Sequence, residues 1–386
     1  MKKINLVHIQ VLPIMSGVQK VMVDFLIHLD RRRYDIKVIC HAEGELTNVL
    51  TKHKISYIIL PELRRKINLY FDVIAFLKLI SIFKKYKFNI VHTHSSKPGF
   101  LGRLAAKIAG VQVIIHTVHG FAFHQFSSKW NILIFQLLEK IAGLAADKII
   151  LLNKTDFEYA IKNRIANVGK LIKIYNGIPL DKFDFEIDIQ KKKYSLNIPN
   201  DYFIVGSVGR LWEQKSPHDF IAAIPDVLKQ VPNTYFLVIG NGHLRKDLES
   251  LSEKLSIQNY IKFLGWRNDV PEILKILDVF VQTSLWEGLS LSILEAMATR
   301  KPIVATNIKG NNELILNNRT GFLIQPNDFK KLASNIIRLL KNKKLAKGMG
   351  REGRKRVEEK FNINSHVEQI ENIYNQLLSS SYYLYI

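Results

Sequence analysis

The feature that most constrains the fold is a repeated alternation of short apolar runs with longer segments of helical periodicity. Apolar runs of this kind indicate strands that are buried on both faces. Strands that are joined by helices must run parallel, because the helix carries the chain back to the starting edge of the sheet. The first half therefore predicts a doubly wound parallel sheet of the α/β class. Its predicted strands are Ile4–Val11, Tyr34–Cys40, Tyr57–Leu60, Asn89–His94, Val111–Thr117 and Lys148–Leu152, and its predicted helices are Val18–Leu29, Leu69–Lys87 and Gly99–Ala109.

The pattern starts again after Asn176-Gly177, in a polar and lysine-rich connector. We therefore predict a domain over 1–175, a second over 176–361 and a last helical segment over 362–386. In the second domain, Pro217 begins a helix at a position that proline favours. The predicted strands there are Phe203–Val208, Thr234–Ile239, Ile261–Leu264, Asp278–Gln282 and Pro302–Ala305, and the helices are Pro217–Lys229, Asp328–Lys341, Lys344–Lys360 and Ser365–Leu378.

Composition excludes several other classes of protein. The chain has 386 residues, enough for two separate cores, and its single cysteine, Cys40, permits no internal disulfide framework. We expect a reducing compartment. The N-terminal run superficially resembles a signal peptide, but Asn5, His8, Gln10 and Pro13 interrupt its apolar core. No run reaches the roughly 18 uncharged apolar residues of a membrane span, so none is predicted.

The net charge of +22 is unevenly distributed. Residues 1–175 contain 27 Lys and Arg against 11 Asp and Glu, and residues 176–386 contain 29 against 23. This excess of +16 in the first half suggests an anionic partner such as a phospholipid surface or a pyrophosphate-linked acceptor. A lysine-favouring genome is the plainer explanation of part of the excess. Nucleic-acid binding is an alternative that we do not favour, because the basic residues are scattered rather than clustered with aromatic residues.

Two glutamates follow a buried apolar strand in the second half. Gly288 breaks the chain after Glu287, and a short helical segment then contains Glu295. At 1.5 Å per helical residue their backbones lie about 10 Å apart, too far to share one reacting atom. The spacing suits a long ligand that is held at two points. The backbone N–H groups of Gly288, Leu289 and Ser290 lie between them and favour negative charge.

This E-x7-E pair resembles the signature of retaining nucleotide-sugar glycosyltransferases of the GT-B fold, in particular glycosyltransferase family 4. The resemblance implies two Rossmann-like domains facing across a cleft, with the last helix crossing back onto the first domain. It also implies that Glu287 and the following amides hold the donor sugar, and that Glu295 binds the ribose hydroxyls. The alternative is a solvated loop glutamate beside an unrelated helix glutamate.

A glycine-containing loop carries two cations in the second domain. Gly206 and Gly209 permit a tight turn, and Arg210 and Lys215 follow on the same loop. A diphosphate leaving group accumulates negative charge as its bond breaks, so it needs such cations. The loop matches the G-R-L…K pattern of the family, whose Arg and Lys contact the donor diphosphate, although a surface pair without a ligand would read the same way. The spacing differs from that of a Walker loop.

Histidines mark the strand ends of the first half. His119-Gly120 matches the H-G of the family, whose histidine reaches the donor sugar beside the reacting carbon; a residue that merely caps a strand is the alternative. We expect His116 to be structural. His92 and His94 alternate along one strand and in principle suit a metal, but no carboxylate or thiol stands nearby in the sequence, so no metal site is predicted. The segment around them resembles a subgroup that builds bacterial capsule, O-antigen and other surface polysaccharides.

Two further positions fit the family less closely. Gly17 remains of a loop in which many members have two glycines, and Ser16 replaces the other. Glu313 fits an acidic position of the family or caps a helix. The Asp-x-Asp pair of manganese-dependent transferases is absent from the sequence. We therefore predict metal-independent chemistry without a cofactor, in which Arg210 and Lys215 replace the cation.

These observations and the family resemblance predict a hexosyltransferase, and the resemblance alone implies that it is a retaining one. Its donor would be a UDP-hexose or UDP-N-acetylhexosamine, and its acceptor a saccharide or lipid-pyrophosphate-linked polysaccharide precursor. A sugar-nucleotide 2-epimerase of the same architecture is the alternative enzyme. We expect a cytoplasmic protein docked on the inner face of the membrane, because of the basic first half, Arg64-Arg-Lys66 before the apolar Leu69–Phe83, and the aromatic segment Phe121–Trp130. Packing of the Leu69–Lys87 helix on its own sheet is the competing interpretation.

Overall fold

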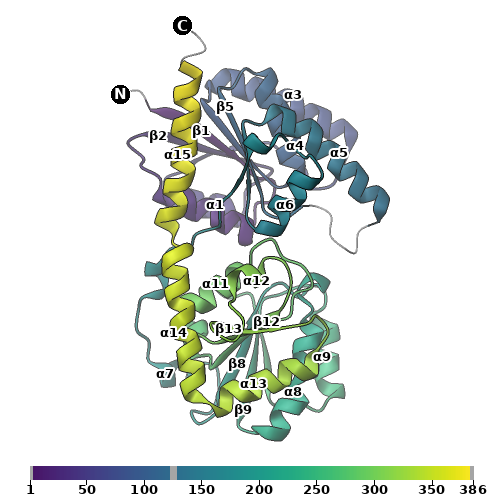
Figure 1. The fold of residues 1–386 in the computed structure, drawn as a ribbon, viewed down its shortest axis with the longest axis vertical. Coiled ribbons are helices and arrows are strands. Elements are labelled where there is room, and N and C mark those ends of the chain that lie inside the picture. Colours follow the sequence, from purple (N-terminus) through teal and green to yellow (C-terminus); the bar gives the residue numbers. More distant parts are fainter. Residues whose placement is uncertain (1–2, 122–127, 383–386) are drawn as a thin grey trace. The chain divides into compact units, whose positions relative to one another are not determined.

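The computed structural model describes residues 3–121 and 128–382 and divides the chain into two compact units. Unit 1 comprises Met1–Gly177 together with Ile363–Ile386, and unit 2 comprises Ile178–Asn362. The last helix, α15 (Ile363–Tyr382), belongs to unit 1 and packs against α1 (Gly17–His28), as the yellow ribbon beside β1 and β2 in Figure 1 shows. Unit 1 is therefore assembled from two segments that are distant in the sequence.

Unit 1 contains a seven-stranded sheet with the order β3-β2-β1-β4-β5-β6-β7, and its paired strands all run parallel. The strand order changes direction between β1 and β4: the chain adds β2 and β3 on one side of β1 and β4 to β7 on the other. Ligands of such sheets bind at this switch point. The bounds are β1 Ile4–Ile9, β2 Tyr34–Cys40, β3 Ser56–Ile59, β4 Ile90–His94, β5 Val113–Val118, β6 Lys148–Leu151 and β7 Leu171–Lys173.

Helices cover both faces of this sheet. Successive side chains along each strand point to opposite faces and therefore belong to two separate apolar cores. Leu6 of β1 belongs to a cluster with residues of α1, α2 and α15, whereas Val7 belongs to a second cluster with residues of α3 and α4. α5 packs on α4. The remaining helices of unit 1 are α2 Glu45–Lys52, α3 Leu69–Tyr86, α4 Ser96–Ile108, α5 Lys129–Ala145 and α6 Lys154–Lys162.

Unit 2 repeats this architecture with a six-stranded parallel sheet of order β10-β9-β8-β11-β12-β13. Its strands are β8 Phe203–Val208, β9 Thr234–Ile239, β10 Ile261–Gly265, β11 Val279–Gln282, β12 Ile303–Thr306 and β13 Gly321–Ile324. Its helices are α7 Ile189–Ser195, α8 Pro217–Gln230, α9 Arg245–Lys254, α10 Val270–Ile276, α11 Leu291–Ala298, α12 Asn311–Leu314, α13 Phe329–Lys341 and α14 Lys343–Lys360. A large apolar cluster beneath α8 and α13 forms its core.

The predicted α/β architecture is confirmed, and several strands match their predicted bounds, for example Tyr34–Cys40 and Thr234–Ile239. The sequence interpretation gave no bounds for α2, α5, α6, α7, α9, α10, α12, β7 and β13. The segment Phe121–Trp130 was interpreted as an aromatic loop; residues 122–127 lie outside the described residues, and Trp130 instead belongs to the first turn of α5. No helix in the described part of the chain combines the length and the apolar character needed to cross a bilayer.

Candidate functional site

The loop between β8 and α8 lies at the carboxyl end of the second sheet. Gly209 donates its backbone N–H to the carbonyl of Ile239 at the end of the neighbouring strand, at 2.9 Å. The next residue of that strand's loop, Gly240, has φ of +130°, and a Cβ there would lie 1.9 Å from the carbonyl oxygen of Gly209. Only glycine permits this close approach. The two loops therefore hold the segment that carries Arg210 and Lys215 in place.

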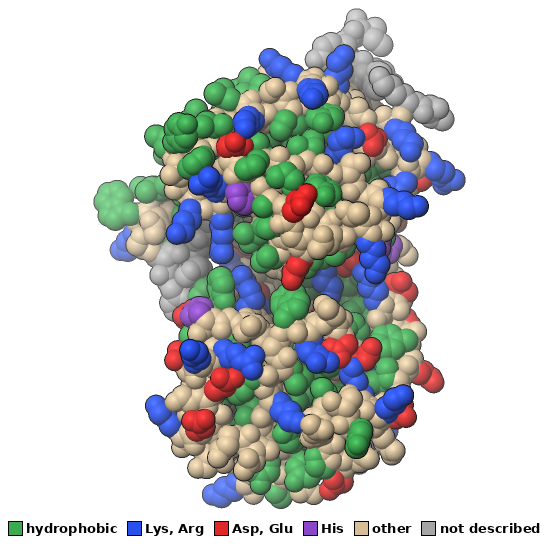
Figure 2. Space-filling model, turned by 180° about the vertical axis from the view of Figure 1, so that it is seen from behind, with side chains coloured by type: hydrophobic (Ala, Val, Ile, Leu, Met, Phe, Trp, Pro, Cys, Tyr) green, Lys and Arg blue, Asp and Glu red, His purple; other side chains and the backbone are tan. Residues whose placement is uncertain are grey.

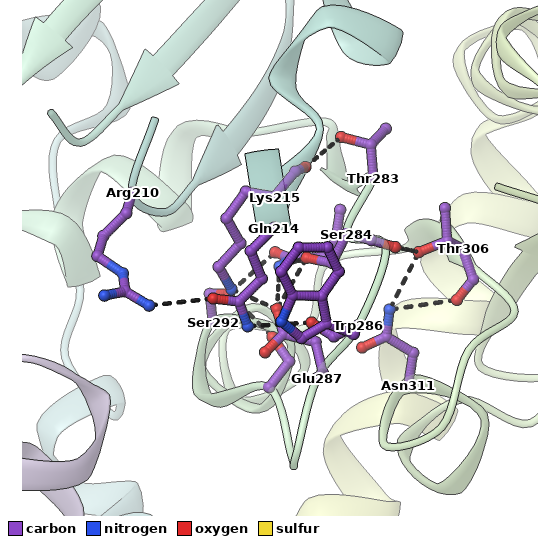
Figure 3. A network of polar contacts seen from close by, with 12 residues as sticks. Arg210, Gln214, Lys215, Thr283, Ser284, Trp286, Glu287, Ser292, Thr306 and Asn311 are labelled. Atoms are coloured by element: carbon purple, nitrogen blue, oxygen red, sulfur yellow. Dashed lines mark hydrogen bonds and ion pairs between the residues drawn. The ribbon is translucent and has the colours of Figure 1, made fainter. Parts of the chain in front are cut away.

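Lys215 and Glu287 form an ion pair at this position. The Nζ of Lys215 lies 2.5 Å from Oε1 of Glu287, and the glutamate side chain is largely buried. The same carboxylate oxygen accepts a hydrogen bond from Ser284 Oγ at 2.8 Å (Figure 3) and another from Gln282 Nε2 at 3.2 Å. A buried carboxylate with several charge-assisted donors is fixed in one orientation. The sequence predicted both residues as ligand contacts but not their pairing.

Arg210 is oriented by its own loop. Its Nη2 donates to Gln214 Oε1 at 3.1 Å, and its guanidinium lies 4.6 Å from the centre of the Trp212 ring. Gln214 in turn donates to the carbonyl of Trp286 at 3.0 Å (Figure 3). The loop after β8 and the loop after β11 are thus held together by side chains of both.

The turn from β11 into α11 carries the remaining predicted donor-binding residues of unit 2. Thr283 fastens the strand end to the β8 loop by donating to the carbonyls of Lys215 and Ser216, at 3.0 and 2.8 Å. Gly288, Leu289 and Ser290 follow, directly before the first residue of α11. Their backbone N–H groups therefore stand at the positive end of a helix. Glu295 is the fifth residue of α11, and its side chain is largely buried.

The pocket at this end of the sheet is lined partly by residues that the sequence interpretation singled out and partly by others. Gly209, Arg210 and Lys215 line it together with Ser207 and Gln282. The sequence analysis passed over Gln282, Ser284 and Gln214, which orient the charged side chains. A usable signal was present, because a buried polar residue at the end of an apolar strand lies at the ligand-binding edge of a parallel sheet.

The loop before α12 approaches the same turn. Gly310 has φ of +84°, and a Cβ there would lie 2.5 Å from the carbonyl oxygen of Gly288 and 3.4 Å from Cβ of Glu287. Nearby, the Thr306 hydroxyl donates to the carbonyl of Ser284 at 2.5 Å (Figure 3). Glu313 lies in the first turn of α12, and its carbonyl accepts a hydrogen bond from Arg356.

Two predicted site residues, Gly17 and His119, lie in unit 1. Gly17 is the first residue of α1, and Ser16 before it donates its hydroxyl to Oε1 of Gln19. His119 follows the end of β5, and its Nε2 lies 3.0 Å from Nδ1 of His94. Burial, with repulsion from His366, lowers the pKa of His119 to about 3, so its ring is neutral at physiological pH.

A cluster of buried histidines continues from His119 into unit 1. His8, His92 and His94 offer ring nitrogens that all lie within 4.8 Å of one another. The sequence analysis weighed His92 and His94 as metal ligands but did not include His8, which is brought beside His92 by the pairing of β1 with β4. His116 lies apart from this group: its Nδ1 contacts Thr93, which points to the opposite face of the sheet. Burial lowers the pKa values of His8, His92 and His94 well below the usual range.

The sites just described occur in a chain with clear relatives. Residues 15–182 match the family described as Glycosyltransferase Family 4, and residues 188–356 match Glycosyl transferases group 1. An Escherichia coli protein named UDP-Gal:alpha-D-GlcNAc-diphosphoundecaprenol alpha-1,3-galactosyltransferase is 38% identical over 96% of this chain and 97% of its own length. The Staphylococcus aureus capsular polysaccharide biosynthesis glycosyltransferase CapM is 28% identical, over 96% of this chain and 95% of its own length.

Solved structures show the same fold. The structure of Anabaena Alr3699/HepE in complex with UDP and glucose has a TM-score of 0.85 at 21% identity, and covers 97% of this chain and 100% of that one. The glycosyltransferase WaaG, involved in lipopolysaccharide biosynthesis, has a TM-score of 0.78 at 16% identity, and covers 96% of this chain and 99% of that one. With two parallel-sheet units of this form and the family match over both, the chain is a GT-B glycosyltransferase that belongs to glycosyltransferase family 4.

Proposed function

We propose that the protein transfers a hexosyl unit, with retention at the anomeric carbon and without a metal ion, from a UDP-sugar to a lipid-pyrophosphate-linked polysaccharide precursor. The observation that carries the donor half of this proposal is the arrangement of Arg210 and Lys215 beside the buried Glu287. The acceptor class is supported by the printed name of the E. coli relative, which acts on an undecaprenol-diphosphate-linked sugar.

Arg210 and Lys215 have the chemistry to receive the diphosphate as the glycosidic bond breaks. Preorganised positive charge stabilises the charge that develops on a leaving group, and it needs no reorientation at that moment. The ion pair with Glu287 keeps the Lys215 ammonium in place before the donor binds. The fixed Glu287 carboxylate and the amides of Gly288 and Leu289 then hold the sugar.

Glu295 and His119 complete the proposed set. Glu295, on α11, would accept hydrogen bonds from the two ribose hydroxyls, which fixes the nucleoside at a distance from the reacting carbon. His119 would contact the donor sugar from unit 1, and Gly17 would allow the backbone of the first loop of that unit to approach the donor.

The reaction is tested by incubating the purified protein with UDP-galactose, UDP-glucose or UDP-N-acetylglucosamine and a short-chain lipid-pyrophosphate sugar. We expect transfer from one of these donors, an axial (α) linkage in the product by NMR, and full activity in EDTA. A β-linked product would contradict retention, and EDTA inhibition that manganese reverses would contradict the metal-free step. Conversion of the donor to its 2-epimer without an acceptor would show the alternative enzyme.

We further propose that unit 1 docks on an anionic membrane through the exposed apolar residues of α3 and α5. α3 buries only Ala75, Leu79 and Phe83 against the sheet, so the packing that competed with membrane contact uses one side of that helix alone. Green side chains gather over this part of unit 1 in Figure 2. We call the following exposed residues the α3–α5 surface: Ile67, Leu69, Tyr70, Val73, Leu77, Trp130, Leu133, Ile134, Leu137, Ile141 and Leu144.

Charge near this surface selects the anionic occupant. Arg64, Arg65 and Lys66 are exposed just before α3, and Lys129 and Lys140 are exposed on α5. Each basic residue near an anionic leaflet contributes about 1 kcal/mol, and inserted aromatic residues add to this. An apolar surface edged by cations favours a phospholipid headgroup layer over nucleic acid, which offers no apolar phase.

Vesicle co-sedimentation tests this surface with a matched pair of tryptophan variants. Trp130 on α5 is 75% exposed, and Trp266 in unit 2 is 56% exposed. We expect Trp130→Ser to weaken binding to vesicles that contain phosphatidylglycerol, Trp266→Ser to leave it unchanged, and added salt to weaken it in both. Equal loss in both variants, or binding that is insensitive to lipid charge, would contradict the proposal. Transfer to a water-soluble acceptor analogue would be unaffected by Trp130→Ser, which separates docking from catalysis.

A further inference from the structure

The buried histidines of unit 1 form one continuous hydrogen-bonded chain that ends at His119. From the far end, the Thr117 hydroxyl lies 2.7 Å from His92 Nε2, and the Tyr374 hydroxyl lies 2.6 Å from His92 Nδ1. Tyr374 belongs to α15 and lies 3.5 Å from His8 Nε2. His8 Nδ1 is 2.8 Å from His94 Nε2, and His94 Nδ1 is 3.0 Å from His119 Nε2.

His8, His92 and His94 each have a hydrogen-bond contact on both ring nitrogens. A neutral imidazole has one N–H donor and one bare acceptor nitrogen, and a phenol donates one proton and accepts another. All the donors must therefore point the same way along the chain. Two orders satisfy this: either His8, His92, His94 and His119 all carry the proton on Nδ1, or all four carry it on Nε2.

The far end of the chain selects between these orders. Thr117 is buried, and among the described residues its side chain has His92 as its only hydrogen-bond partner. If His92 donated from Nε2, the Thr117 hydroxyl would have to accept, and its own proton would be left without an acceptor in the interior. A buried donor without a partner costs about 1–3 kcal/mol. In the opposite order, Thr117 donates to His92 and every donor up to His94 has an acceptor.

We propose that this chain holds His119 as the tautomer with its proton on Nδ1, so that His119 presents a fixed hydrogen-bond donor, and not a base, to the ligand. His8, His92 and His94 together with Tyr374 are then positioning residues that act through His119. The consequence for transfer rests on the proposed contact of His119 with the donor sugar. A donor at this place suits a sugar oxygen, and it cannot remove a proton from the acceptor hydroxyl because Nδ1 already carries one.

Burial supports this assignment. It lowers the pKa values of His8, His92 and His94 well below the usual range and raises that of Tyr374 well above it. Every group in the chain is therefore neutral at physiological pH. The hydrogen bond on one ring nitrogen sets which form the ring adopts.

Nitrogen-15 NMR of histidine-labelled protein reads each tautomer directly. The chain contains 12 histidines, so single substitutions assign the signals. His366 supplies an internal reference, because its Nδ1 lies 2.7 Å from the carbonyl of Tyr175 and a carbonyl can only accept. We expect His8, His92, His94 and His119 to share the Nδ1–H pattern of His366. A mixture of tautomers among the four, or a shared Nε2–H pattern, would overturn the proposal.

Paired variants then test the link to His119. His94→Leu removes the donor to His119 Nε2, whereas His116→Leu makes the same change at a buried histidine on the other face of the sheet. We expect the Nδ1–H signal of His119 to change in His94→Leu and to persist in His116→Leu. Tyr374→Phe cuts the chain between His92 and His8, so Thr117 no longer selects the order of the donors beyond the cut, and we expect the signals of both His92 and His119 to change. Tyr34→Phe, in the same core cluster, should alter neither. An unchanged His119 in a folded His94→Leu variant would contradict the link.

Two more readouts separate this proposal from its alternatives. In His94→Leu we expect kcat for sugar transfer to fall about 10-fold or more with the KM for the donor little changed. If the His119 tautomer changes and kcat does not, the tautomer assignment stands and the proposed contact of His119 with the sugar fails. Stoichiometric binding of Co²⁺ with a ligand-field spectrum that is lost in His92→Gln would show a metal site instead, and would overturn the proposal.

Discussion

The two sheets have the same topology at their carboxyl ends but opposite electrostatic character there. In unit 2 the polar residues are charged, and Lys215, Glu287 and Arg210 are held by short charge-assisted contacts. In unit 1 the polar residues are neutral imidazoles, and a hydrogen-bonded chain links them to the helix behind. The difference teaches that one sheet topology can carry a largely buried ion pair at its carboxyl edge in one unit and hydrogen-bonded neutral rings at the same edge in the other.

Lowering the pH is expected to have the largest effect on the difference between the two units, because it should destabilise unit 1 much more than unit 2. His8, His92, His94, His116, His119 and His366 all have pKa values below the ordinary 6.5, primarily because of burial. Below pH 6.5 the unfolded chain therefore binds more protons than the folded one, and stability falls as the pH falls. Each such histidine removes up to about 1.4 kcal/mol per pH unit. The loss continues toward pH 4 and pH 3, the values for His366 and His119.

Hydrogen exchange at pH 7 and pH 5, corrected for intrinsic rates, measures this loss unit by unit. We expect protection of β1, β4 and β5 to fall by several kcal/mol and that of β8 and β9 to fall much less. Equal losses in the two units would contradict the assignment of acid sensitivity to the histidine cluster.

The next largest effect distinguishes a structural ion pair from the proposed functional one. Arg103 on α4 is fully buried and lies 2.7 Å from Glu139 on α5. Removing one partner of such a pair leaves an unpaired buried charge and costs about 3–5 kcal/mol. Arg103→Met should therefore lower the thermal midpoint by several degrees without changing the affinity of UDP in calorimetry. Weaker UDP binding in the folded variant would show that the pair also serves unit 2.

Lys215→Ala and Arg210→Ala are expected to show the reverse behaviour. Each removes preorganised positive charge from the proposed diphosphate site, so turnover should fall on the order of 10²-fold or more. Lys229, in the last turn of α8, the helix that follows this loop, offers a control substitution that should leave the rate unchanged. Near-normal rates in both site variants would place the diphosphate elsewhere.

Glu295→Ala is expected to have the smallest of these effects. Loss of hydrogen bonds to a charged carboxylate costs about 1.5–3 kcal/mol, which corresponds to roughly 10- to 100-fold weaker donor binding. Calorimetry with UDP checks this directly. If the unchanged protein binds UDP and 2′,3′-dideoxy-UDP with the same affinity, the proposed contact of Glu295 with the ribose hydroxyls is contradicted.

The sequence predicted the architecture because local patterns carry it. Strands such as Thr234–Ile239 are nearly continuous apolar runs, and such runs between helical segments have few other structures available. α5 escaped prediction for a related reason: apolar residues occupy its buried and its exposed sides, so its sequence shows no clear amphipathic period.

The contacts within each site depend on which strands become neighbours in the sheet. The local sequence pattern does not contain that information. Lys215 meets Glu287 because β8 pairs with β11, as in the register that places Val279 beside Val205. His8 joins His92 because β1 pairs with β4 across more than eighty intervening residues. The residue types alone predicted a ligand site, but the side chains that contact one another there could be identified only from the order of the strands in each sheet.

The discontinuous first unit has a consequence for how the protein is made. Its sheet is complete by Lys173, yet α15 supplies Ile370, Ile373 and Tyr374 to its core. Domains generally fold as units and the N-terminal ones fold first during synthesis. Here one apolar face of the unit 1 sheet stays uncovered until the ribosome has synthesised the whole of unit 2 and then α15. Closing so long a loop slows the final docking step. Until that step occurs, the interval is a window in which a chaperone, or an encounter with a second nascent chain, competes for the same uncovered surface.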